Sequence, residues 1–153
     1  MKRTTYLLLG LLAATLGAAQ PVYATLGESA DSVMTDRKAL SAAQIVTTTR
    51  NAYTIQEISS DSVAVREYIS PSGMVFGIAW NGLTHPDLTL LLGSYTDEYQ
   101  KSLRQTPRKP GRRFSQIKTD RIVVEKWGHM RNLHGRAYVP SLIPPGVNID
   151  EIK

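Results

Sequence analysis

The stretch Met-Val-Phe-Gly-Ile-Ala-Trp, at residues 74–80, constrains the fold more than any other part of this sequence. As an extended strand it is apolar on both faces, which is typical of a strand in the interior of a sheet. The large side chains share one face: Met74, Phe76, Ile78 and Trp80. The small side chains share the other: Val75, Gly77 and Ala79. We expect the large face to pack on helices, whereas the small face allows close approach of a second layer or another subunit.

Two segments have the spacing of amphipathic helices. Residues 29–43 carry apolar side chains near one stripe, with Ser29 and Asp31 as candidate N-caps. The stronger helix begins near Thr84, where Asp87 follows at capping-box spacing and Pro86 suits a first turn. Its apolar residues recur in steps of three and four: Leu88, Leu91, Leu92, Tyr95, Tyr99 and Leu103.

Four further segments resemble strands, at residues 53–58, 63–69, 122–127 and 136–139, and the threonines at 47–49 favour an extended backbone. Residues 105–117 are rich in proline and cations, and we expect a basic loop there. The pattern therefore predicts an α+β fold, a small antiparallel sheet of about five strands packed against two helices.

The N-terminal 24 residues resemble a secretory signal peptide. Met-Lys-Arg precedes an uncharged apolar run from Leu7 to Ala19, and Val-Tyr-Ala at 22–24 resembles a cleavage site. An uncleaved anchor is the alternative, but the run is shorter than the roughly 20 residues that span a bilayer. We expect export to the periplasm or the exterior, with no transmembrane segment after cleavage. The mature chain would be one α+β domain (25–140) and a proline-rich tail (141–153).

Charge is unevenly distributed along the chain, whose formal net charge is +5. Residues 25–100 hold four cations and nine acids, whereas residues 101–136 hold eleven cations and two acids. Four cations of this basic segment are candidate ligands for an anionic polymer or lipid: Arg108, Lys109, Arg112 and Arg113. The alternative is a solvated loop without a ligand. Nucleic acid is not expected, because an exported protein does not meet it and aromatic side chains spaced to stack bases are lacking.

The search for catalytic chemistry finds no convincing constellation. The chain has no cysteine, which excludes disulfides, Cys-ligated metal sites and thiol catalysis. His129 and His134 are five residues apart, not the four that would place two metal ligands on one helical face. Glu57 and Glu67 could form a carboxylate pair, but solvent exposure or pairing with Arg66 or Arg50 is the better interpretation. We expect no enzyme, no cofactor and no metal.

Three stretches together resemble a known family. They are residues 66–80, residues 86–93, and the segment that holds Gly-His-Met-Arg (128–131), Gly-Arg-Ala-Tyr-Val-Pro (135–140) and Pro-Gly-Val (145–147). They are similar to the bacterial domain-of-unknown-function family numbered 2844, a set of exported single-domain proteins. The resemblance covers nearly all of the mature chain and implies export and a shared fold, but no activity.

Three functions follow as hypotheses. The first is a non-enzymatic cell-envelope protein that binds another protein or assists assembly. The second is a binder of anionic envelope polymers or lipids through residues 101–136. The third is an enzyme that uses a candidate functional loop of four side chains: His129, Arg131, His134 and Arg136. The expected partner is an envelope protein or an anionic polymer, and a homo-oligomer is left open.

Overall fold

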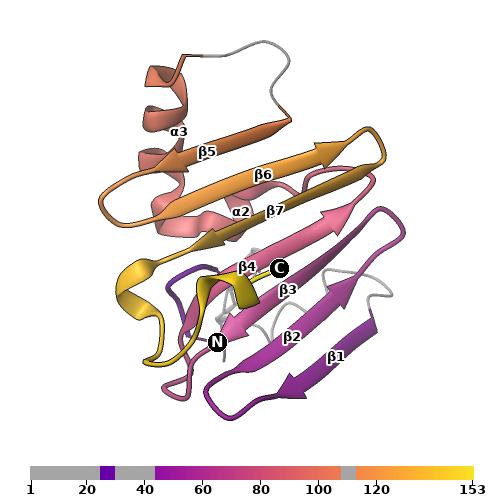
Figure 1. Ribbon diagram of the computed structural model, residues 1–153, viewed down its shortest axis with the longest axis vertical. Helices are drawn as coiled ribbons and strands as arrows, with labels where there is room; N and C mark the ends of the chain where they lie inside the picture. The colour runs from indigo at the N-terminus through magenta and orange to yellow at the C-terminus, as the bar shows by residue number, and fades with distance from the viewer. Residues whose placement is uncertain (1–24, 30–43, 108–112) are drawn as a thin grey trace, which may run out of the picture.

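The chain forms one antiparallel sheet of seven strands, seen in a computed structural model that describes residues 25–29, 44–107 and 113–153 (Figure 1). The strands are β1 (Gln44–Thr49), β2 (Thr54–Ser59), β3 (Val63–Ile69), β4 (Val75–Gly82), β5 (Phe114–Lys118), β6 (Val123–His129) and β7 (Asn132–Tyr138). Their order across the sheet is β1-β2-β3-β4-β7-β6-β5, so β4 is the central strand and β1 and β5 are the edges. The predicted interior position of residues 74–80 is confirmed.

One helical segment follows β4 and covers one face of the sheet. It consists of α2 (Leu88–Leu92), the 3-10 turn η2 (Gly93–Tyr95) and α3 (Thr96–Gln105), which follow one another without a gap. Asp87 caps α2, because its carboxylate accepts a hydrogen bond from the Thr89 N–H at 2.9 Å. Gly93 interrupts the helix at φ 47°, where an added Cβ would collide with the Thr25 side chain. Glycine is therefore required at this bend.

The predicted fold class is wrong, since the sheet has seven strands rather than five and one helical segment of 18 residues rather than two helices. β5 begins within the expected basic loop (105–117) and ends one residue beyond it, and only Ile117 of its five residues is buried. An edge strand that buries one side chain carries almost no alternating pattern, so composition alone pointed to a loop. The helix expected over 29–43 lies outside the described residues, except Ser29, which bridges to Met74.

The main hydrophobic core lies between the sheet and the helical segment. Its largest members include Trp80, Ile78, Leu92 and Ile122, all almost fully buried. The expectation that one face of β4 holds all the large side chains is wrong for Phe76. The register of β3 against β4 shifts between Tyr68 and Ile69, and Phe76 packs in a second core instead. Such a bulge turns later side chains to the opposite face.

The C-terminal tail forms the layer on the other face. Two 3-10 turns, η3 (Pro140–Leu142) and η4 (Ile149–Glu151), carry it back across β4 and β3 (Figure 1). Ile152 is fully buried there, and a Cβ added at Gly77 would lie 3.0 Å from its Cδ1 atom. The small side chains of β4 thus make room for a segment of the same chain. We call this side the tail face and the opposite side the helix face.

Polar side chains of the sheet hold the tail in place. The Arg66 guanidinium donates to the Lys153 carbonyl at 2.5 Å. The Tyr68 hydroxyl bonds both the N–H and the C=O of Lys153, at 3.1 and 3.0 Å. The Tyr53 hydroxyl donates to the Glu151 carboxylate at 2.6 Å. The first three of these bonds pair the backbone groups of Lys153, and the fourth holds the Glu151 side chain.

Candidate functional site

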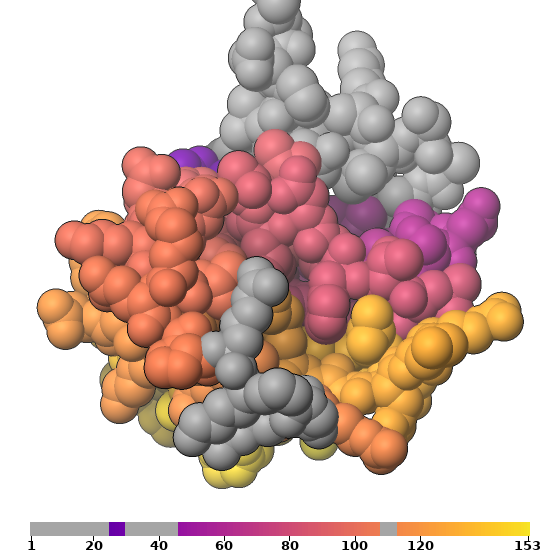
Figure 2. Space-filling view, turned by 90° about the horizontal axis from the view of Figure 1, so that it is seen from above, coloured from indigo at the N-terminus to yellow at the C-terminus, as the bar shows by residue number. Residues whose placement is uncertain are grey.

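The basic segment of the sequence gathers at one end of the molecule, around the edge strand β5. Figure 1 shows α3 and β5 together at this end, and Figure 2 looks down on it. Arg113 and Lys118 lie at the two ends of β5, and α3 contributes Lys101 and Arg104; all four residues are exposed. We call β5 with these four cations the basic edge. Arg108, Lys109 and Arg112 lie outside the described residues and directly precede Arg113 in sequence.

The cations near this edge divide into two groups by their partners. Arg121 pairs with Glu98 at 2.6 Å, and Lys126 donates to the Tyr99 hydroxyl at 3.0 Å. The four cations of the basic edge have no carboxylate partner among the described residues. An unpaired cation remains available to an external anion, whereas a paired one would have to give up its partner first.

Two of the exposed apolar side chains lie at the basic edge and in the β6–β7 turn. Phe114, the first residue of β5, is 47% exposed, and Met130 in the β6–β7 turn is 91% exposed. Arg131 follows Met130 at φ 66°, an uncommon conformation for a residue with a Cβ. At the basic edge, Phe114 directly follows Arg113, so a ligand there can meet both a charge and an apolar side chain.

Three of the four side chains of the candidate functional loop, those of His129, His134 and Arg136, lie on one face of the β6–β7 hairpin, and Arg131 lies in its turn. Arg136 is used within the fold: it pairs with Glu125 at 2.5 Å and donates to the carbonyls of Ile149 and Ile152, at 2.9 and 3.3 Å. His134 stacks on Trp127 with ring centroids 6.0 Å apart, and its Nε2 bonds Asn132 at 2.8 Å. Arg131 and His129 are exposed at the hairpin end. Packing and tail docking therefore account for His134 and Arg136.

The comparisons with known proteins agree with the resemblance noted from the sequence. Residues 22–152 match the family described as Protein of unknown function (DUF2844). The chain belongs to this family. No curated protein and no solved structure matches it. For this DUF2844 protein, function must therefore be argued from its own residues.

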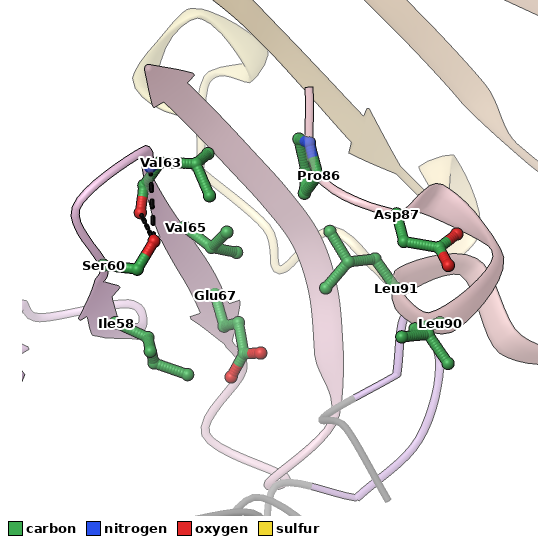
Figure 3. A pocket seen from close by; sticks show the side chains of 9 residues that line it. All are labelled: Ile58, Ser60, Val63, Val65, Glu67, Pro86, Asp87, Leu90 and Leu91. Atoms are coloured by element: carbon green, nitrogen blue, oxygen red, sulfur yellow. Dashed lines mark hydrogen bonds between the residues drawn. The ribbon is translucent and has the colours of Figure 1, made fainter. Parts of the chain in front are cut away.

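The DUF2844 domain also has a pocket on its helix face. A cavity of about 190 Å³ lies between β2 and β3 on one side and residues 86–91 on the other (Figure 3). Its walls are mostly aliphatic, with the carboxylates of Glu67 and Asp87 as the charged groups. Asp87 caps α2, and Glu67 has an interaction partner of its own. Both carboxylates are thus in structural use.

The two glutamates considered as a catalytic pair lie on opposite faces of the sheet. Glu57 accepts from Arg66 at 2.7 Å, so that predicted cross-strand pair is confirmed. Glu67 is the neighbour of Arg66 on β3, so it points to the other face, where it is buried. The prediction of solvent exposure for Glu67 is wrong. The carboxylates therefore cannot act on one bond from the two sides.

His85 is exposed, but its ring contacts the buried side chain of Trp80. The Trp80 indole N–H donates to its Nδ1 at 2.9 Å. Loss of water around the ring, and secondarily the charge of Lys126, lower the pKa of His85 below its usual range. The neutral ring is the form that accepts this hydrogen bond, so His85 helps to fix Trp80 in the core.

Within residues 25–29, 44–107 and 113–153, no three His, Asp or Glu side chains are grouped as a metal ion would require. In the same part of the chain, no helix is long and apolar enough to cross a membrane. Sequence reasoning missed the edge strand β5, because Ile117 is its one buried residue and leaves no alternating pattern among the cations.

Proposed function

We propose that this DUF2844 protein is an exported, non-enzymatic module of the cell envelope that binds an anionic polymer at its basic edge. Export rests on the N-terminal signal-peptide pattern. The observation that carries the binding function is the set of four exposed cations around β5 without carboxylate partners among the described residues. Such a field attracts polyanions and weakens as salt rises.

The geometry of the basic edge favours an extended ligand over a small one. Lys118 and Arg113 lie at opposite ends of a five-residue strand, which spans roughly 17 Å at the usual rise per residue. A chain with repeated carboxylate or phosphate groups can contact the separate cations at the same time.

A second candidate function is protein binding by strand addition. No described strand pairs with the outer side of β5, so its outward backbone groups are open to an extended segment of a partner. Such a segment would have to be acidic to match the surrounding cations. Strand addition would resist salt more than polymer binding, because backbone hydrogen bonds are not screened in the same way.

The test measures binding of a fluorescent polyuronate to the purified protein at low and high salt. The variant Arg113→Ser/Lys118→Ser removes two cations of the basic edge. Arg50→Ser/Lys153→Ser is the matched control, with the same change of net charge on exposed residues away from that edge. Vesicles of phosphatidylglycerol and of phosphatidylcholine distinguish a lipid ligand from a glycan.

We expect the double variant at the basic edge to bind roughly three- to tenfold more weakly, since exposed ion pairs contribute up to about 1 kcal/mol each. The control variant should lose much less affinity for the polyuronate. The affinity of the unchanged protein should fall steeply as the salt concentration rises. Equal losses in both variants would mean attraction by net charge alone and would contradict a defined site. Binding that ignores salt and both variants would overturn the proposal.

A further inference from the structure

The two edges of the sheet differ in how they are protected from other strands. β5 carries Lys118 and follows a run of cations, and charged side chains at an edge discourage pairing with a second copy. β1, Gln44–Thr49, has the sequence Gln-Ile-Val-Thr-Thr-Thr, without charge or proline. Figure 1 shows β1 at the opposite margin of the sheet, and no described strand pairs with its outer side.

β1 has the properties of a strand that pairs. Five of its six residues are β-branched, and it pairs with β2 over its whole length without a register shift. Val46 is 49% exposed although it is apolar. A regular, uncharged strand with high β-propensity is an aggregation hazard when its edge stays open. Such an edge therefore favours pairing with another strand.

We propose that β1 pairs antiparallel with β1 of a second copy of this chain, which joins the two sheets into one. A two-fold axis perpendicular to the sheet relates the strands, so both tail faces stay on the same side. Residues opposite each other in an antiparallel pair point to the same side of the sheet. Around the middle of β1 this allows two registers, with Val46 opposite Val46 of the other copy or Thr47 opposite Thr47. Neither register opposes like charges, because β1 has none.

The second copy fits this edge better than a charged partner does. An acidic or basic segment would find no opposite charge on β1 itself, whereas an identical strand matches its β-branched side chains and buries Val46. The symmetric pairing also ends at two copies, because each copy has one uncharged edge and uses it in the dimer. The basic edges then lie at the two ends of the joined sheet, remote from the interface. The inference does not depend on what the basic edge binds.

The test combines mass measurement with single-cysteine cross-linking, which is possible because the chain has no cysteine of its own. Analytical ultracentrifugation of the purified protein gives the mass over a concentration series. Val46→Cys and Thr47→Cys report the two registers under mild oxidation, and Lys118→Cys on the opposite edge strand is the matched control. Thr48→Lys places a charge on the edge at an exposed position, and circular dichroism checks that this variant is folded.

We expect a dimer whose β1 cysteine, at 46 or 47, cross-links within the time in which Lys118→Cys stays unlinked. Thr48→Lys should remain folded and lose the dimer. A protein that is monomeric over the whole concentration series would overturn the proposal. So would a dimer that survives Thr48→Lys, or one that cross-links at residue 118 as fast as at residues 46 and 47.

Discussion

Arg136 joins the sheet to the C-terminal tail. Its guanidinium pairs with buried Glu125 and donates to two tail carbonyls, and it lies 6.0 Å from the Trp127 ring and 5.9 Å from the Tyr138 ring. Removing one partner of a buried pair leaves the other charge without compensation. The stability of the tail face near β7 thus depends on this one residue.

Replacing Arg136 should therefore cost much more than replacing a surface arginine. We expect Arg136→Met to lower the free energy of unfolding by about 3 kcal/mol. Arg121→Met is the control, because Arg121 is 57% exposed in its pair with Glu98 and should lose under about 1 kcal/mol. Urea unfolding monitored by tryptophan fluorescence measures both. Equal losses of unfolding free energy in the two variants would show that the Arg136 pair contributes no more than the exposed Arg121 pair.

The Tyr53–Glu151 bond makes the tail sensitive to pH. The Tyr53 hydroxyl first, and the Asn148 N–H second, hold the pKa of Glu151 below 4.5. Because the pKa of Glu151 is lower in the folded than in the unfolded protein, its carboxylate stabilises the fold at pH values above the unfolded pKa. This stabilisation is lost as the pH falls through the folded pKa. Burial, reinforced by Glu151, raises the pKa of Tyr53 to about 12, so its contribution is lost as pH rises from 10 through that value.

Tyr53→Phe should raise the pKa of Glu151 toward its ordinary value, because the strongest donor to the carboxylate is gone. A carboxyl-carbon NMR titration measures this shift. Tyr138→Phe is the control, since Tyr138 is buried on the same face but does not bond Glu151. An unchanged Glu151 titration in Tyr53→Phe would mean that the tail is not docked as described.

At the scale of elements, the tail acts as the second layer of the sheet. Ile152 is fully buried among Tyr53, Tyr68 and Phe76, whose rings lie 5.8 to 6.2 Å apart. We expect Ile152→Ala to lower the free energy of unfolding by about 3 kcal/mol, since it leaves a cavity in this core. Ile149→Ala, at a half-buried position of the same tail, should cost less than half as much. The urea unfolding curves of the two variants measure these losses. Small losses of similar size in both variants would contradict a tail that packs against the sheet.

The elements predicted well from sequence are those with a strong period. Residues 74–80 and the helix from Leu88 onward bury many side chains, so burial is visible in the spacing. β5 was missed because only one of its residues, Ile117, is buried. The tail carries one fully buried residue, Ile152, so the spacing of its side chains shows little of how it docks. Composition could place the cations near Arg113 in the chain, but only the sheet order shows that they flank an open edge.

In the whole molecule, two edge strands of different character lie at opposite margins of the seven-stranded sheet. β5 ends the sheet with cations, and β1 ends it with uncharged β-branched residues. A dimer through β1 would present two basic edges to one polymer chain, which raises avidity without new contacts. Both proposals use surface that the hydrophobic cores do not need.

Amide hydrogen exchange with and without the polyuronate tests the binding claim most directly. The account predicts slower exchange in β5, in the residues that flank it and at the end of α3, and unchanged exchange in β1 to β3. Protection spread evenly over the surface, or confined to β1 to β3, would contradict the basic edge as the binding site.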